Sequence, residues 1–305
     1  MSISSLEKSL SAYILNTASC IYNGNAKNHP IIVTNALKNI LGDVRSSPSK
    51  KILDYIDNHN QNYIQPRNDK IHLKNISKEE IGLTIFISDL EDACQKGDYD
   101  KTQKGLARTY LASDGSPAIL QNLAEIALQN IEENVIFVYH YLRAFAFSPD
   151  KEKVWIFLQC IIQILFNKKL PNPHPNEKIK EADINKYFLN CNRLNELNNL
   201  SASWRLLESE YTRLPGFRRE ISYWANKSTA FDSINDKEKD PDDLKLYLRN
   251  QTDYYVKVAE HIIESDTDTV ERLITLESLR YFTKRIDKNH LPILAYKIHS
   301  LLDKQ

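Results

Sequence analysis

Scarcity of glycine is the sequence feature that most constrains how this chain can fold. Only seven of its 305 residues are glycine, about 2% where proteins usually have ~7%. β-Barrels, β-sandwiches, Rossmann units and P-loops all need glycine at tight turns or beside phosphates. The composition therefore argues against these architectures and against the nucleotide sites that accompany them.

Hydrophobic periodicity indicates an all-α fold instead. Apolar residues recur at helical spacing in nearly every segment, and no segment alternates convincingly with period two. Start and stop signals divide the chain: His29 and Pro30 open a helix that Gly42 ends, and Asp98 caps another just after Gly97. No strict solenoid repeat is visible. We expect a dozen or more helices in an irregular bundle or a HEAT-like superhelix.

Local signals set expectations for four further segments. Ser77 to Glu80 reads as a capping box that opens a helix running to about Lys96. Residues 67–75 are polar and are expected to form a loop. Ser148 is expected to cap the helix that follows it. Residues 242–305 carry apolar positions for three helices.

The prolines predict the domain organisation. Pro171, Pro173 and Pro175 alternate in PNPHPN, and such a run cannot lie inside a helix. We expect residues 171–176 to link an N-terminal helical lobe, 1–170, to a C-terminal helical lobe, 177–305. Short linkers of this kind also occur inside single helical domains, so one continuous domain is the alternative.

Net charge, cysteine content and hydropathy limit the binding partners and the cellular compartment that we expect. Forty Lys and Arg balance forty Asp and Glu, which removes the net attraction that non-specific nucleic-acid binding needs. Cys20, Cys94, Cys160 and Cys191 lie in apolar stretches without CxxC spacing and are expected to be buried free thiols. Neither a signal peptide nor a membrane span is predicted. We expect a cytoplasmic protein that binds neither nucleic acid nor membranes.

Residues 137–147 contain the highest density of side chains suited to binding or catalysis. On a helix, Phe137, His140 and Tyr141 share one face, and Tyr139 and Arg143 are neighbours on another. The functional interpretation is a pocket in which the three aromatic residues bind a planar ligand, His140 is the general acid or base, and Arg143 stabilises an anion or enolate. The alternative is a core helix with a hydrogen-bonded histidine and an arginine that reaches solvent.

Three other positions are candidates for chemistry. His29, before Pro30, could serve as a base or ligand, or could be an ordinary surface residue. His261 and Glu264 have the i, i+3 spacing of two ligands in a carboxylate-bridged metal site. The remaining ligands would have to come from Glu125, Glu132 and Glu133. Because nothing in the sequence ties these residues together, no metal site is predicted and no cofactor is identified.

Three segments of this sequence, taken in chain order, resemble three segments of a known protein family. Asn28-His29-Pro30 leads through Thr34-Asn35-Ala36-Leu37 and Ser47-Pro48 to Tyr55, residues 134–146 hold His140 and Arg143, and residues 270–280 form a Thr-containing stretch. These segments resemble the first hairpin, the central histidine helix and the late segment of the questin oxidase-like family. His29 matches the family pattern directly, His140 lies slightly out of register, and Glu271 or Arg272 stands at the late histidine.

The resemblance implies an all-helical relative of enzymes that open polyketide-derived aromatic rings by Baeyer–Villiger-type oxidation. One hypothesis is therefore an oxidoreductase-like protein that binds or oxidises a small aromatic compound. The other is a non-catalytic helical scaffold that binds a protein partner. Convergence of His29, His140 and His261 on one enclosed cavity would favour the first hypothesis.

Overall fold

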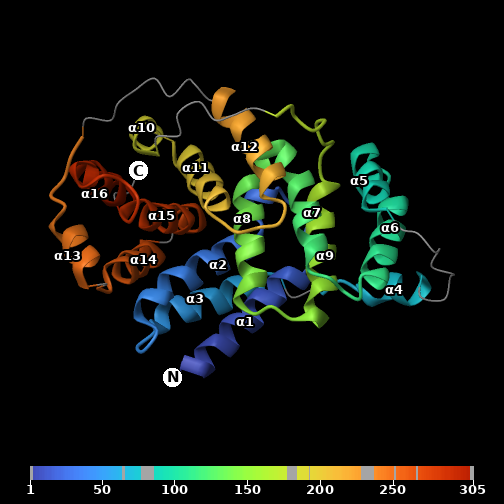
Figure 1. Cartoon of the computed structure of the whole chain (residues 1–305). Helices are drawn as coiled ribbons and strands as arrows, with labels where there is room; N and C mark the ends of the chain where they lie inside the picture. The colour runs from blue at the N-terminus through green and yellow to red at the C-terminus, as the bar shows by residue number, and fades with distance from the viewer. Residues whose placement is uncertain are drawn as a thin grey trace.

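The computed structural model describes residues 3–63, 66–76, 86–176, 184–191, 193–227, 237–250, 252–265 and 267–302. Regular structure within these ranges is helical, and their one β contact is an isolated bridge between Cys20 and Pro66. The prediction of an all-α fold is therefore confirmed (Figure 1). No helix in these ranges is long and apolar enough to cross a membrane.

The helices follow one another along the chain. The first part of the chain forms α1 (Ile3–Ser19), α2 (Pro30–Leu41), α3 (Lys50–Gln61), α4 (Lys70–Ile76), α5 (Ile87–Lys96), α6 (Tyr99–Ala112), α7 (Ala118–Ala127), α8 (Ile131–Phe147) and α9 (Lys151–Leu165). The second part forms α10 (Ile184–Asn190), α11 (Leu194–Leu207), α12 (Leu214–Lys227), α13 (Asp242–Asn250), α14 (Tyr254–Ser265), α15 (Thr269–Thr283) and α16 (Leu291–Ser300). Short 3-10 turns lie at Ala26–Asn28, Gly42–Val44, Leu128–Asn130 and Lys288–His290.

Local capping explains several of these boundaries. The Asp98 side chain accepts a hydrogen bond from the Lys101 amide at 3.1 Å and so starts α6. Gly97 has a φ of 67°, the left-handed conformation that ends α5 at little cost. The boundaries predicted at Gly97, Asp98 and Pro30 are confirmed.

Three local predictions are wrong. Residues 67–75 were expected to form a loop, but α4 occupies most of them, because Leu73 and Ile76 pack into the core and α4 packs on α6. Residues 242–302 form α13 to α16, one helix more than expected. Asp150, and not Ser148, caps α9 by accepting from the Glu152 amide at 3.0 Å. The capping box at Ser77 lies outside the described residues, and the helix that reaches Lys96, α5, begins at Ile87 after an extended Phe86.

Four helices, α2, α8, α11 and α15, form the centre of the molecule. α2 packs on α8, α8 on α11, α11 on α15, and α15 back on α2, which closes a ring (Figure 1). α1 and α3 pack beside α2, α7 packs beside α8, and α14 and α16 pack against α15. The buried apolar residues of the described chain form one continuous core cluster.

Side-chain contacts show that α2 and α8 run in the same sense. His29, just before α2, packs its ring 5.0 Å from that of Phe137 in the first half of α8. Lys38, near the end of α2, places its Nζ 4.8 Å from the ring centroid of Phe147, the last residue of α8. Both helices therefore bring their C-terminal ends to the same side of the molecule.

α11 and α15 follow the same direction. The Asn199 amide reaches the Glu132 carbonyl at the start of α8, and Arg205, near the end of α11, reaches Tyr139 further along α8. The N-terminal parts of α8, α11 and α15 surround a hollow of about 690 Å³, lined among others by Ile136, Asn195, Asn198, Asp268, Thr269, Val270, Glu271 and Ile274. Acidic residues occupy the first turns there, namely Glu132, Glu133, Glu196 and Glu271. Acidic side chains favour the positive end of a helix dipole.

The proline-rich stretch lies between helices that contact each other. Residues 171–176 contain no helix, as their alternating prolines dictate. Helices from both sides of this stretch meet in the central ring, where α8 packs on α11 and α2 packs on α15. The division into two lobes stays a prediction.

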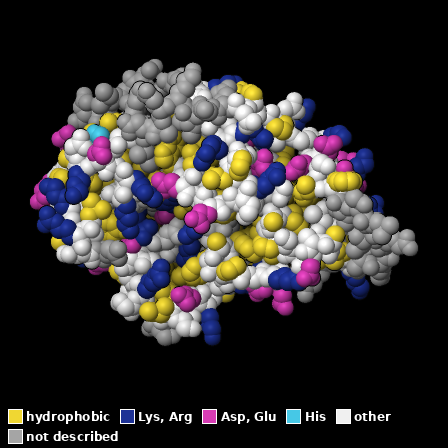
Figure 2. All heavy atoms as spheres, viewed as in Figure 1, with side chains coloured by type: hydrophobic (Ala, Val, Ile, Leu, Met, Phe, Trp, Pro, Cys, Tyr) yellow, Lys and Arg dark blue, Asp and Glu magenta, His cyan; other side chains and the backbone are white. Residues whose placement is uncertain are grey.

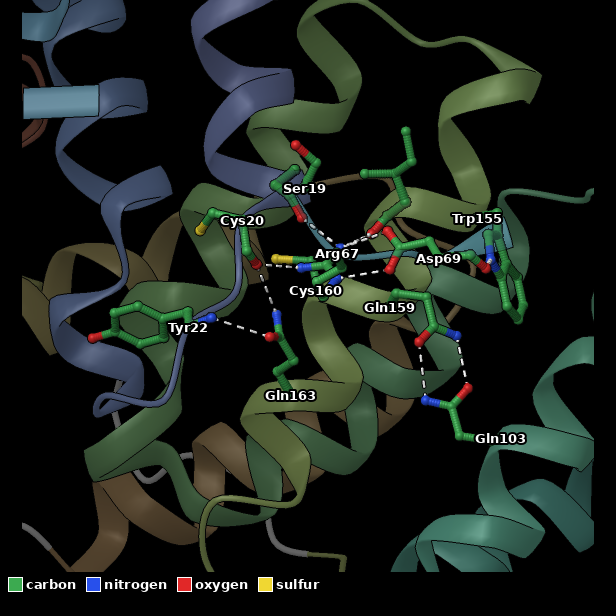
Figure 3. A network of polar contacts seen from close by, with 12 residues as sticks. Ser19, Cys20, Tyr22, Arg67, Asp69, Gln103, Trp155, Gln159, Cys160 and Gln163 are labelled. Atoms are coloured by element: carbon green, nitrogen blue, oxygen red, sulfur yellow. Dashed lines mark hydrogen bonds and ion pairs between the residues drawn. The ribbon is translucent and has the colours of Figure 1, made fainter. Parts of the chain in front are cut away.

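A buried arginine fastens the end of α1 to α9 (Figure 3). Arg67 donates hydrogen bonds to the carbonyls of Ala18 and Cys20, at 2.8 Å each, and to that of Ile156 at 3.0 Å. Its Nε and Nη2 also donate to the carboxylate of Asp69, at 2.9 and 3.0 Å. One guanidinium thus satisfies three backbone carbonyls and a buried carboxylate.

Paired glutamine amides extend this network (Figure 3). Gln103 of α6 and Gln159 of α9 exchange two hydrogen bonds of 2.9 and 2.8 Å. Gln163 of α9 accepts from the Tyr22 amide at 3.1 Å and donates to the Cys20 carbonyl. α9 is therefore connected to α6 and to the chain that follows α1 by polar contacts as well as by packing.

We predict that Arg67→Met lowers the free energy of unfolding by roughly 3–5 kcal/mol, because it leaves the Asp69 carboxylate buried without a partner. Urea unfolding measures the change. Arg249→Met is the matched control: Arg249 is exposed on α13, and its loss should change stability by no more than about 0.5 kcal/mol. Equal urea midpoints for the two variants would contradict the role assigned to Arg67.

Candidate functional site

A cleft of about 810 Å³ lies at the C-terminal ends of the four central helices. Residues of α1, α2, α8, α11 and α15 line it. Its described lining contains seven basic side chains, Lys38, Arg45, Arg143, Arg205, Arg280, Lys284 and Arg285, and three acidic ones, Glu7, Glu208 and Glu277. In Figure 2, Lys and Arg side chains gather on the left half of the face in view, where Figure 1 places α13 to α16.

A buried ion pair between α11 and α15 forms the floor of the cleft. Arg205 contacts both carboxylate oxygens of Glu277, at 2.8 and 2.7 Å, and donates to the Tyr139 hydroxyl at 2.8 Å. Its guanidinium lies between two rings, 4.8 Å from the centroid of Tyr139 and 4.5 Å from that of Tyr281. Burial alone would raise the pKa of Glu277, but the charge and hydrogen bonds of Arg205, together with smaller contributions such as the charge of Arg280, outweigh burial and hold this pKa at about 2. Glu277 therefore stays ionised and committed to Arg205.

Two further basic residues of the cleft have carboxylate partners. Arg280 donates from Nε to Asp43 at 2.7 Å, and Arg285 donates to Glu208 at 2.9 Å. In each of these two pairs, as in the pair of Arg205 with Glu277, the opposite charges cancel.

The side chains of the other four basic residues, Lys38, Arg45, Arg143 and Lys284, have no hydrogen bond or ion pair with any residue that the structure describes. Glu7 also lines the cleft but pairs with none of them, so the seven basic side chains exceed Glu7, Glu208, Glu277 and Asp43 by three charges.

Lys38 differs from the other three because it is buried. Its side chain comes from the last turn of α2, and the residue is only 8% exposed. Its nearest aromatic contact is the Phe147 ring, and no described oxygen accepts a hydrogen bond from its Nζ. Burial, and next the charge of Arg143, lower the pKa of Lys38 to about 7. At neutral pH about half of this amine is the uncharged, nucleophilic form.

His140 lies inside the ring of helices and does not line the cleft. Its Nδ1 is 2.8 Å from the amide nitrogen of Asn35 on α2. Burial lowers the pKa of His140 to about 3, so the imidazole is neutral at physiological pH. The side chain is thus a hydrogen-bonded core histidine directly behind Tyr139.

His29 is also buried and also lies away from the cleft lining. Its Nδ1 accepts from the Ile31 amide at 3.2 Å, which caps α2 and leaves the proton on Nε2, 3.6 Å from the sulfur of Cys160. Burial lowers the pKa of His29 to about 3 and raises that of Cys160 to about 12. The pair is therefore neutral, unlike the thiolate–imidazolium pair of a cysteine nucleophile.

Of the predicted site residues on α8, some lie at the cleft and others lie in the core. Tyr139 and Arg143 line the cleft. Phe137 and Tyr141 are buried in the core, and the Tyr141 hydroxyl donates to the Phe157 carbonyl at 3.0 Å. The structure thus brings two of these predicted residues to the site, and places Phe137, Tyr141 and His140 behind it.

His261 and Glu264 lie on the exposed face of α14, where Glu264 pairs with Lys51. Glu125 binds Arg213 and Arg219 instead. Among the described residues, no group of three His, Cys, Asp or Glu side chains could hold a metal ion.

Several cleft residues were missed by the sequence analysis. Three of them are charged residues with apolar neighbours, namely Lys38 in NALKNIL, Arg205 in WRLL and Glu277 in LITLESL. A charged residue on an apolar helix face must find a partner or a cavity. This pattern in the sequence could have indicated these residues as part of a site. It does not say which of the three lacks a partner.

Comparison of the chain with protein-family models, with curated proteins and with solved structures found no match. The resemblance to the questin oxidase-like family stays a prediction.

We predict that the two buried histidines make the protein sensitive to acid. Their pKa values are lower in the folded chain than the ordinary 6.5, so the unfolded chain binds more protons below that pH. The stabilisation is complete above pH 6.5 and is lost as the pH falls toward 3. His140→Gln should flatten this dependence by about 1 kcal/mol per pH unit between pH 6 and 4.

Urea unfolding at a series of pH values measures this slope. His261→Gln is the control, because an imidazole exposed on α14 meets solvent in both states. A His140→Gln slope as steep as that of the wild type would contradict the burial of a neutral imidazole at this position.

Proposed function

We propose that the protein binds a small organic anion with a flat ring in the cleft at the C-terminal ends of α2, α8, α11 and α15. The observation that carries the proposal is the group of basic side chains that have no carboxylate partner among the described residues. Gathering like charges is costly, and a carboxylate or phosphate group of a ligand would relieve their repulsion.

The helix dipoles account for part of this charge but not for all of it. Each helix C-terminus carries roughly half a negative charge, which favours Lys and Arg nearby. An exposed side chain is sufficient for that effect, as Arg143 and Lys284 illustrate. Burial of Lys38 brings no such benefit and costs desolvation, which supports a role in binding for this residue.

The cleft walls favour a flat ligand. Tyr139, Tyr281, Tyr211 and Phe147 all contribute to the lining. Tyr139 and Tyr281 already hold Arg205, so a ligand would contact Tyr211 and, beside the Lys38 amine, the Phe147 ring. A volume of about 810 Å³ lies within the range of roughly 300–1,000 Å³ that is usual for small-molecule sites.

The structure favours binding of a small molecule over docking of a protein. Large exposed apolar side chains in the described ranges are few and come from different segments, namely Ile3, Ile21, Ile71, Phe86, Tyr99, Leu246 and Leu248. A protein-docking surface normally needs a contiguous apolar patch. Oxidation of the ligand, as the family resemblance implies, stays a prediction, since His29 and His140 do not line the cleft.

Calorimetric titration with phenyl phosphate, benzoate and benzyl alcohol tests the proposal. The two anions should bind, and more weakly at high salt, because exposed charges are screened. Benzyl alcohol has the same ring without charge and should not bind measurably. Inorganic phosphate alone should bind more weakly than phenyl phosphate, because it lacks the ring.

We predict that Arg143→Gln weakens binding of phenyl phosphate about tenfold, the effect of losing one charge-assisted hydrogen bond. Arg249→Gln removes an exposed arginine outside the cleft and should leave the affinity unchanged. The proposal fails if neither anion binds at millimolar concentration, or if the two variants bind alike.

A further inference from the structure

We propose that Lys38 forms an imine with a ligand of the cleft, an aromatic aldehyde or ketone that also carries an acid group. This inference rests on the proposed function and adds a covalent step to it.

Lys38 is a buried lysine whose amine faces the cleft and has no hydrogen-bond partner in the described chain. Buried lysines normally have a hydrogen-bond acceptor, and Lys297 shows the usual arrangement in this protein. Lys297 is 9% exposed, and its Nζ donates to the Cys191 carbonyl at 2.6 Å. Lys38 is 8% exposed and lines the cleft, and no residue in the described part of the chain accepts from its Nζ.

The charged groups around Lys38 favour the free amine. Arg143 of α8, Arg280 of α15 and Arg45 after α2 all act to lower its pKa, in addition to burial. Glu277 acts in the opposite direction, but its carboxylate is bound by Arg205. Desolvation and neighbouring cations are the combination that activates lysine nucleophiles.

The chemistry is a condensation that needs no oxidant or reductant. The nitrogen lone pair of Lys38 attacks the carbonyl carbon, and one proton moves from nitrogen to oxygen to give a carbinolamine. The hydroxyl group then takes up a proton from solvent and leaves as water while the C=N bond forms, and loss of the remaining N–H proton to solvent gives the imine. The partnerless guanidinium of Arg143, which lines the same cleft, would hold the acid group of the ligand.

Reductive trapping of the full chain with 4-carboxybenzaldehyde tests the inference. Sodium cyanoborohydride reduces the imine to a stable secondary amine, and peptide mass spectrometry then locates the carboxybenzyl group. At pH 7 we expect Lys38 to be labelled at least about ten times faster than exposed lysines, because far more of it is unprotonated. Its labelling rate should level off above pH 8, whereas that of exposed lysines should continue to rise.

Matched variants and ligands separate the covalent step from binding. Lys38→Arg keeps the positive charge and should abolish the fast label, whereas Lys297→Arg should retain it. Arg143→Gln should slow labelling by 4-carboxybenzaldehyde but not by benzaldehyde, which has no acid group. 4-(Hydroxymethyl)benzoate has the acid and the ring but no carbonyl, and should bind the cleft and slow the labelling.

The outcomes distinguish the two proposals. If 4-(hydroxymethyl)benzoate binds but Lys38 reacts no faster than exposed lysines, the imine is wrong and the anion site stands. If that acid does not bind and Lys38 is not labelled preferentially, both proposals are wrong. Fast labelling that persists in Lys38→Arg would also overturn the assignment to Lys38.

Discussion

The ion pair between Arg205 and Glu277 is the interaction on which the central helices and the cleft both depend. It joins α11 to α15 at the level where the rings of Tyr139 and Tyr281 enclose the guanidinium. Removing one partner of such a pair leaves an uncompensated buried charge, which is strongly destabilising. By binding Glu277, Arg205 also removes the carboxylate that would otherwise neutralise Lys38. The same contact therefore stabilises the ring of helices and leaves the cleft basic.

The fold was predictable wherever the deciding interactions are local. Asp98 and Gly97 act through neighbouring backbone groups, so their helix boundaries could be read from the sequence. α4 was missed because burial of Ile76 against distant elements supports it. Hydrophobic periodicity predicted helices, but it carried no information about which four would close into a ring.

The site was predictable only in part, for the same reason. Spacing on one helix face placed Tyr139 and Arg143 together, and both line the cleft. His140 looked equally suitable, yet packing against Asn35 of α2 makes it a core residue. Lys38 is important because no residue of the described structure accepts a hydrogen bond from its Nζ. Whether an acceptor is nearby depends on α8 and α15, which are far from Lys38 in the sequence.

The common direction of the four central helices separates acidic from basic side chains in a molecule of zero net charge. Acidic first turns collect at one end of the ring and basic residues at the other, in line with the aligned peptide dipoles. The side-chain charges partly cancel the peptide dipoles, and the basic cleft side chains that have no partner in the described chain attract and orient an anion before the two touch. Long-range orientation would speed encounter with an anion without making the complex longer-lived.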